Sequence, residues 1–168
     1  PTNNKRVGVF VDESIETVVK IAKKLSLKGV QLHANENVKY LQELKIKLLD
    51  TLIIKAVAIA TTDDLVHLNQ LDEVVDLFIF DTKGRLPGGN GIQFDWNILS
   101  DYKGATPFLL SGGIGPGDID AITNFKKQLN HPQFVGVDLN SKFEDSPGVK
   151  NVEKLTNFVA SLKNEAWL

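Results

Sequence analysis

The chain has 168 residues, of which 42% are hydrophobic and 24% charged, and its formal net charge is −2. This composition is typical of one globular domain with a substantial core, and it excludes a disordered chain. No block of lysine or arginine would bind nucleic acid or a membrane surface through bulk charge. No apolar run approaches the ~20 residues of a membrane helix, and the polar first residues are no signal peptide. We therefore expect a cytoplasmic protein without nucleic-acid or membrane partners.

The chain contains no cysteine, which excludes disulfides, zinc–thiolate sites and a thiol nucleophile within these residues. Its three histidines are scattered and poorly supported by acids, so we expect no metal centre. Methionine is absent too. Either an initiator methionine is removed before Pro1, or the sequence begins inside a longer protein.

Six short apolar runs, rich in β-branched residues, predict buried strands of a parallel sheet. In chain order they cover residues 7–11, 29–33, 53–57, 77–81, 107–111 and 134–138. Helical periodicity between these runs predicts helices over residues 15–25, 38–49, 63–71, 96–99, 119–129 and 152–162. Asp63 and Asp64 are predicted to start the third of these helices, and Asp118 to cap the fifth.

Alternating strands and helices predict a parallel sheet with right-handed crossovers, and no linker divides residues 1–168 into separate domains. Two architectures fit, an open doubly wound sheet and part of a (β/α)8 barrel. The turn after the first strand, residues 11–14, is acidic and lacks the glycines of a nucleotide-binding fingerprint. Phosphate-type turns come late instead, as in barrels. The favoured fold class is α/β, a (β/α)8 TIM barrel with six of its eight β/α units in this chain.

Asp81 ends the fourth predicted strand, at the edge of the sheet where parallel α/β enzymes carry out their chemistry. The loop that follows contains Gly88, Gly89 and Gly91. An acid at a strand end often caps the next helix, but here a glycine-rich loop follows, which favours a catalytic acid. Partial burial at this edge would raise the pKa of the carboxyl group, as general-acid catalysis requires.

Two turns after the fifth and sixth strands are candidates for binding phosphate. Gly112 and Gly113 lie in a turn that leads into a helix, where backbone N–H groups and the helix dipole favour an anion. The alternative is a tight turn that binds nothing. Asp138, Asn140 and Ser141 follow the sixth strand at the same edge of the sheet.

Four further polar residues have less certain roles. His33 ends the second strand and either binds substrate or makes a structural hydrogen bond. Lys55 lies inside a strand, so its ammonium must reach the edge of the sheet or find a partner. His67 and His131 are interpreted as surface residues.

Seven segments, in this order along the chain, resemble phosphoribosylanthranilate isomerase, a (β/α)8-barrel family of tryptophan biosynthesis. They are residues 7–11, 30–33, 80–83, 88–96, 110–114, 136–138 and 147–150. The resemblance implies an Amadori rearrangement of the phosphosugar N-(5-phosphoribosyl)anthranilate, without a cofactor. An acid opens the ribose ring, and a base then removes the C2′ proton. It implies that Asp81 is the acid, that the turns at Gly112–Gly113 and Asn140–Ser141 hold the phosphate, and that Asp138 lines the site.

The sequence departs from the family pattern in several places. The family's base is a cysteine that ends its first strand, and its anthranilate-contacting arginine follows its second strand; neither has a counterpart here. We expect the chain to begin just before the family's third strand. It would then lack the first two strand–helix units, which together amount to roughly 40–60 residues. Lys142 stands where the family often has glycine, and Ala34 replaces a glycine common after the histidine.

Such a chain would expose two sheet edges, so we expect it to be marginally stable and inactive alone, or to be covered by a second copy. Two alternatives to the isomerase remain. One is another phosphate-binding barrel enzyme of the indole pathway, which the pairing of residues 80–83 with the glycine loop disfavours. The other is a truncated barrel that binds phosphosugars or associates with itself without turnover.

Overall fold

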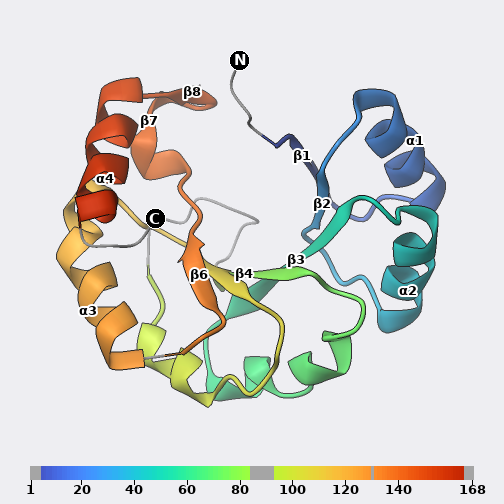
Figure 1. Cartoon of the computed structure of the whole chain (residues 1–168), viewed down its shortest axis with the longest axis horizontal. Coiled ribbons are helices and arrows are strands. Elements are labelled where there is room, and N and C mark those ends of the chain that lie inside the picture. Colours follow the sequence, from blue (N-terminus) through green and yellow to red (C-terminus); the bar gives the residue numbers. More distant parts are fainter. Residues whose placement is uncertain (1–4, 84–92, 130, 165–168) are drawn as a thin grey trace. The chain divides into compact units, whose positions relative to one another are not determined.

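The computed structural model describes residues 5–83, 93–129 and 131–164. Its main sheet has six strands that neighbour one another in chain order (Figure 1). They are β1 (Val7–Phe10), β2 (Gly29–Leu32), β3 (Leu52–Ile59), β4 (Leu77–Thr82), β5 (Phe108–Leu110) and β6 (Phe134–Val137). The pairs β1–β2, β2–β3 and β5–β6 are parallel. All six predicted strands are confirmed, with ends shifted by one or two residues.

The helices follow most of the predicted periodicity. They are α1 (Ile15–Leu25), α2 (Val38–Lys47), α3 (Ile119–Leu129) and α4 (Val152–Asn164), with a short 3-10 helix, η3, at Trp96–Asp101. The helix predicted over 63–71 is wrong. Two 3-10 helices, η1 (Thr62–Leu65) and η2 (Leu68–Leu71), replace it, because His67 between them is left-handed at φ 74°. Among the described residues no helix is both long and apolar enough to cross a membrane.

Two local features differ from the sequence analysis. Asp118 is predicted to cap α3, but within the described residues its carboxylate makes no hydrogen bond to the first turn of that helix. A 3-10 turn, η4 (Pro116–Asp118), precedes α3, and Asp118 is its last residue. The Asp118 carboxylate accepts a hydrogen bond from the Gly115 amide at 2.6 Å, so it braces the turn before α3. The sequence analysis also missed an antiparallel hairpin of β7 (Glu144–Ser146) and β8 (Val149–Lys150), which follows the 3-10 turn η5 (Ser141–Phe143).

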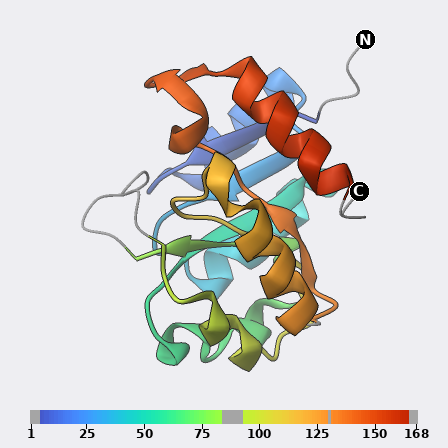
Figure 2. The same ribbon diagram turned by 90° about the vertical axis from the view of Figure 1, so that its left-hand side faces the viewer.

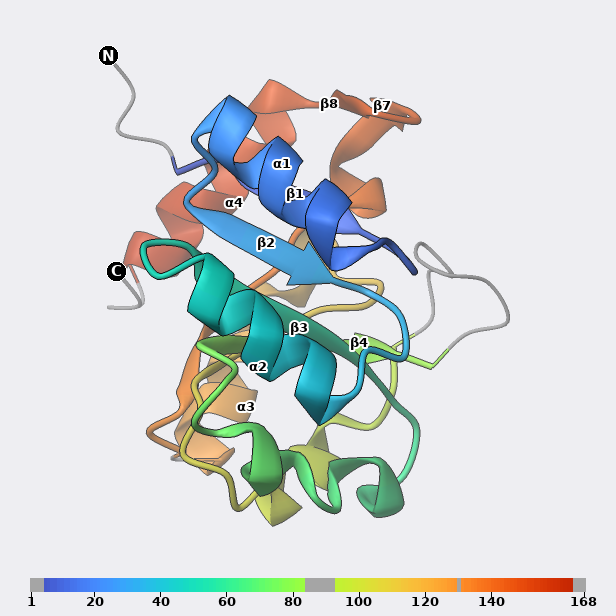
Figure 3. The ribbon, with the colours of Figure 1, turned by 90° about the vertical axis from the view of Figure 1, so that its right-hand side faces the viewer.

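The chain divides into two compact units, described separately here. The first comprises residues 1–57, 66–79 and 103–107. In it α1 and α2 lie side by side along β1, β2 and β3 (Figure 3). Ser14 caps α1 by accepting a hydrogen bond from the Thr17 amide at 3.2 Å. Val18, Leu41 and Leu44 are fully buried and form the helical side of this unit's core.

The second unit comprises residues 58–65, 80–102 and 108–168. Its helices α3 and α4 lie side by side (Figure 2). An aromatic cluster fills its core, where the ring of Phe80 lies 4.8 Å from that of Phe108 and 5.3 Å from that of Tyr102. The surface interpretation of His131 is wrong. The residue is half-buried, and its Nε2 lies 3.0 Å from the Tyr102 carbonyl oxygen, because its ring packs against Tyr102 and Phe108.

Asp72 joins two segments of the first unit. Its carboxylate accepts hydrogen bonds from the Ala105 amide at 2.8 Å, the Thr106 amide at 3.0 Å and the Thr106 hydroxyl at 2.6 Å. Burial raises the pKa of Asp72, but these hydrogen bonds outweigh it and hold the pKa below its ordinary 3.8. Because the folded-state pKa is lowered, this stabilisation is present above about pH 4 and is lost as the pH falls through the folded-state pKa.

We predict that Asp72→Asn lowers the free energy of unfolding at pH 7 by about 1–3 kcal/mol, since two charge-assisted hydrogen bonds are weakened and one is lost. Urea denaturation at pH 7 and at pH 3 measures the effect. The gap between variant and wild type should narrow at pH 3. A gap of equal size at both pH values would contradict the role of the ionised carboxylate.

Candidate active site

Asp81 is the second-last residue of β4 and belongs to the second unit. Its side chain is half-buried, and its Oδ1 accepts a hydrogen bond from the Thr82 amide at 2.8 Å. One residue earlier, the Phe80 carbonyl accepts a hydrogen bond from the Ser111 amide at 2.8 Å. The turn that follows β5 therefore begins directly beside the acid.

Gly112 continues this turn in direct contact with Asp81. Its backbone is left-handed, at φ 90°, and Gly113 follows at φ 66°. A Cβ atom on Gly112 would lie 2.3 Å from Thr82 Oγ1, 2.7 Å from Thr82 N and 2.8 Å from Asp81 Oδ1. All three distances are below any normal contact, and an L-residue is disfavoured at this φ. Glycine is therefore required for the turn to approach the carboxylate this closely.

Asp138 joins the site from the end of β6. Its backbone amide donates to the Leu110 carbonyl at 2.8 Å, and its Oδ2 accepts a hydrogen bond from the buried Ser111 hydroxyl at 3.0 Å. Asn140 and Ser141, both exposed, follow within three residues. The ends of β4, β5 and β6 are thus linked by hydrogen bonds within one unit.

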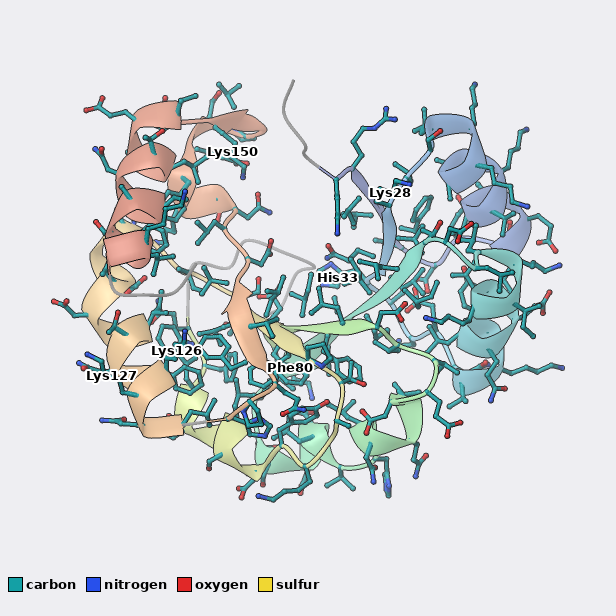
Figure 4. The ribbon with its side chains drawn as sticks, in the orientation of Figure 1. Lys28, His33, Phe80, Lys126, Lys127 and Lys150 are labelled. Carbon is teal, nitrogen blue, oxygen red and sulfur yellow. The ribbon has the colours of Figure 1, made fainter. Side chains whose placement is uncertain are left out.

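The turn at Asn140 is braced by the β7–β8 hairpin. Lys150 donates to Asn140 Oδ1 at 2.6 Å and to Glu144 Oε1 at 2.7 Å, and Figure 4 shows it beside this hairpin. The hydrogen bond from Lys150 lowers the pKa of the Glu144 carboxyl group. Phe143, fully buried, packs on Phe158 of α4 at 5.0 Å between ring centres. The turn therefore has both polar and apolar anchors.

Lys142 brings the two candidate phosphate turns into contact. Its Cβ and Cγ lie 3.5 and 3.6 Å from the position of a Cβ on Gly115, at the end of the first turn. The second unit thus places six of the seven predicted site residues around one edge of the sheet: Asp81, Gly112, Gly113, Asp138, Asn140 and Ser141. The functional roles given to these residues stay predictions.

The seventh predicted residue, His33, belongs to the first unit. It follows β2, where Figure 4 labels it, and is half-buried, with its amide donating to the Phe10 carbonyl at 3.0 Å. Lys55, left open by the sequence, finds its partner here. Its ammonium donates to the Ala34 carbonyl at 2.7 Å and pairs with Glu36 at 3.1 Å. Burial lowers the pKa of Lys55, and the Glu36 charge opposes that shift.

Other predicted features have mixed outcomes. Asp64 lies inside η1, which begins at Thr62, so the predicted helix start at Asp63 and Asp64 is wrong; the Asp64 carboxylate instead accepts hydrogen bonds from the preceding Ala60 and Thr61 amides at 2.8 and 3.0 Å. It also pairs with Lys83, at 2.9 Å. The glycine loop at residues 88–91 lies outside the described residues. Within the described ranges, no group of three or more histidine, aspartate or glutamate side chains is placed to hold a metal ion.

The sequence analysis missed the bracing by Lys150, although it quoted this residue in a family motif. The available signal was the dipeptide Pro147-Gly148, which is typical of a tight turn between two short segments. This dipeptide predicts a hairpin, and a hairpin brings Lys150 back beside Glu144.

Comparison with known proteins gives a consistent result. The family model "N-(5'phosphoribosyl)anthranilate (PRA) isomerase" matches residues 1–161. An N-(5'-phosphoribosyl)anthranilate isomerase of Parabacteroides distasonis is 44% identical over 96% of this chain and 71% of its own. Engineered monomers of the dimeric Thermotoga maritima enzyme match 96% of this chain and 74% of theirs, with a TM-score of 0.76 and 26% identity.

A third relative was solved with a bound ligand. It is a phosphoribosyl anthranilate isomerase in complex with reduced 1-(o-carboxyphenylamino)-1-deoxyribulose 5-phosphate. It matches 98% of this chain and 74% of its own, with a TM-score of 0.74 and 25% identity. The α/β fold with six parallel strands is therefore shared with these enzymes over about three quarters of their chains.

We predict that Gly112→Ala lowers the free energy of unfolding by about 2–4 kcal/mol, from overpacking against Thr82 and Asp81 and from the left-handed φ. Gly117→Ala is the matched control, because nothing lies within 4 Å of its Cβ position and its φ is not positive. It should change stability by about 0.5 kcal/mol or less. Equal urea midpoints for the two variants would contradict the close contact between Gly112 and the Asp81–Thr82 segment.

Proposed function

The chain belongs to the N-(5'-phosphoribosyl)anthranilate isomerase family, and from that premise we propose that it carries the acid and the phosphate site of this reaction. The reaction is the Amadori rearrangement of N-(5'-phosphoribosyl)anthranilate to its 1-deoxyribulose 5-phosphate derivative. The observation that carries the proposal is the contact of one half-buried carboxylate, Asp81, with a glycine turn whose backbone suits an anion.

In this proposal Asp81 acts as general acid. It donates its proton to the ribose ring oxygen, the C1′–O bond breaks, and the anthranilate nitrogen forms a Schiff base with C1′. A base then removes the C2′ proton, and the resulting enol tautomerises to the ketone. The electron pair stays within the substrate throughout, so the rearrangement is an internal redox isomerisation that needs no external oxidant or reductant.

The phosphate is proposed to lie between the turns at Gly112–Gly113 and Asn140–Ser141. Gly112 and Gly113 both have positive φ in a tight turn, and the backbone N–H groups of such turns are able to bind anions. Asp138 is proposed to line the substrate site, since Ser111 holds its carboxylate beside the first turn. A relative solved with a phosphosugar-like ligand supports a phosphosugar as the partner.

His33 is proposed as a further substrate-binding residue, contributed by the first unit. The fold proposed for the whole site is the (β/α)8 barrel, with six of its units formed by β1 to β6 and the segments that connect them. The sequential strand order and the match to about three quarters of the related barrels support this architecture.

We predict that Asp81→Asn lowers kcat by about 10²–10⁴-fold in a form of the protein with isomerase activity, because the amide cannot donate a proton to the ring oxygen. The Kd of the reduced product analogue named above should change less than about threefold, since Asn keeps the size of the side chain. Activity is measured by loss of substrate fluorescence and binding by calorimetry. Retention of near-normal turnover would remove Asp81 from its role.

The proposal includes the source of the base. The family's base is a cysteine, and these residues contain none, so we propose that the 168-residue chain alone is inactive. A second copy of the chain would not restore the reaction through a cysteine. It could still cover the edge of the sheet at β1, where Val7, Val9 and the neighbouring Val11 are exposed.

We predict that the chain alone turns over substrate at less than about a thousandth of the rate of a complete relative. Adding a separately expressed fragment with the first two strand–helix units of such a relative should restore activity, and the same fragment with its cysteine replaced by serine should not. Sedimentation of the chain alone tests self-association. Full turnover by the chain alone would overturn this assignment and require another base; phosphosugar binding without restored turnover would favour the non-enzymatic alternative.

A further inference from the structure

We propose that Lys142 is a phosphate-binding residue that supplies the positive charge between the two anion-binding turns. The inference rests on the proposed function, because it takes the turns at Gly112–Gly113 and Asn140–Ser141 as the phosphate site. It goes further by assigning a ligand contact to a side chain at a position where the resemblance leads one to expect glycine.

The first step is the charge that the site already carries. Asp81 and Asp138 lie beside the first turn, and Asp118 lies at its end, where it binds the Gly115 amide. A phosphate monoester is close to a dianion at neutral pH. Backbone amides supply only partial positive charges, so a full cation nearby would favour an anion held among carboxylates.

The second step is which cation is available. Among the described residues of this edge, Lys83 is paired with Asp64 at 2.9 Å, and Lys150 is held by Glu144 and Asn140. Lys142 is exposed, and in the described part of the chain its ammonium makes no hydrogen bond or ion pair. It is therefore the lysine of this group that is not committed to a protein partner.

The third step is position. Lys142 is the second residue of η5, one residue after the turn at Asn140–Ser141. Its Cβ and Cγ lie against Gly115, which ends the other turn, so its stem crosses between the two. The neighbouring Phe143 is fully buried and fixes the backbone from which this side chain starts. A flexible ammonium on a fixed stem suits a phosphate, which lysine binds as a point charge.

The same geometry explains why the acid of this loop does not capture Lys142. Glu144 lies two residues further along, but its carboxylate already accepts a hydrogen bond from Lys150 at 2.7 Å. The Asp118 carboxylate accepts hydrogen bonds from the Gly115 amide at 2.6 Å and from Gln93 at 2.9 Å. Both carboxylates are held by these donors, and within the described residues neither is paired with the Lys142 ammonium.

The test measures the Kd of inorganic phosphate for the full 168-residue chain. Binding is monitored by ³¹P NMR titration at low and at high NaCl. Lys142→Gln removes the charge and keeps most of the stem, and should raise the Kd about 5- to 10-fold at low salt. Its affinity should also fall less steeply with NaCl than that of wild type, because one screened charge is gone. Lys142→Arg should stay within about threefold of wild type, since the cation is kept.

Lys154→Gln is the matched control. Lys154 is a surface lysine of α4 whose ammonium lies 3.9 Å from the Asp145 carboxylate. The Lys154→Gln variant should leave the Kd for phosphate and its salt dependence unchanged. Unfolding midpoints of all variants should agree with wild type, which separates a ligand contact from a structural role. Saturable binding with equal affinity in wild type and Lys142→Gln would overturn the assignment of Lys142 and leave the proposed function standing. Lack of saturable phosphate binding by wild type would overturn both.

Discussion

The contact between Gly112 and the Asp81–Thr82 segment is the constraint on which the rest of the candidate site depends. The missing side chain of Gly112 leaves the space that Thr82 Oγ1 and Asp81 Oδ1 occupy. The Thr82 hydroxyl is buried there and makes no hydrogen bond within the described residues, which is an unfavourable arrangement for a polar group. Close packing is achieved here at the cost of a hydrogen bond, and it holds the Asp81 carboxylate against the turn that is proposed to bind phosphate.

From this contact the site extends by hydrogen bonds along the edge of the sheet. Ser111 connects β4 to β6, because its amide donates to Phe80 and its hydroxyl donates to Asp138. The β7–β8 hairpin then holds the turn at Asn140 through Lys150. The acids of this edge therefore have distinct tasks. Asp118 and Glu144 accept hydrogen bonds from protein donors and shape the two turns, whereas Asp81, the proposed acid, lies beside Gly112 of the first turn.

The sequence predicts the sheet well, because buried parallel strands are continuous apolar runs that local pattern alone reveals. The helix predicted over residues 63–71 is wrong for a local reason. The left-handed backbone of His67 divides an apparently helical pattern into two 3-10 helices. The prediction that His131 lies on the surface is wrong for a tertiary reason, because its partial burial depends on Tyr102 and Phe108, which are distant in sequence. The sequence predicts that Asp81 and the glycine turn lie at one edge, because parallel strands end there together, and the structure brings them into contact. Their close approach depends on the positive φ of Gly112, which residue types alone do not reveal.

Lys55 shows how the first unit stabilises the loop that follows β2. A lysine whose side chain is 9% exposed would be unfavourable in an apolar strand, and burial does lower its pKa. Its partners offset that penalty. They are the carboxylate of Glu36, itself 6% exposed, and the backbone carbonyls of Ala34, Ala56 and, at 3.5 Å, Leu32.

Two of these four partners belong to the short segment that follows His33, and Glu36 also accepts a hydrogen bond from the Ala34 amide at 3.2 Å. The ammonium therefore ties the loop after β2 to β3 through charge and backbone together. A hydrophobic residue in place of Lys55 would fill the strand equally well but would leave this loop without its anchor. The buried pair thus specifies a conformation, and the residue whose position it fixes is the histidine that the sequence places at the end of β2.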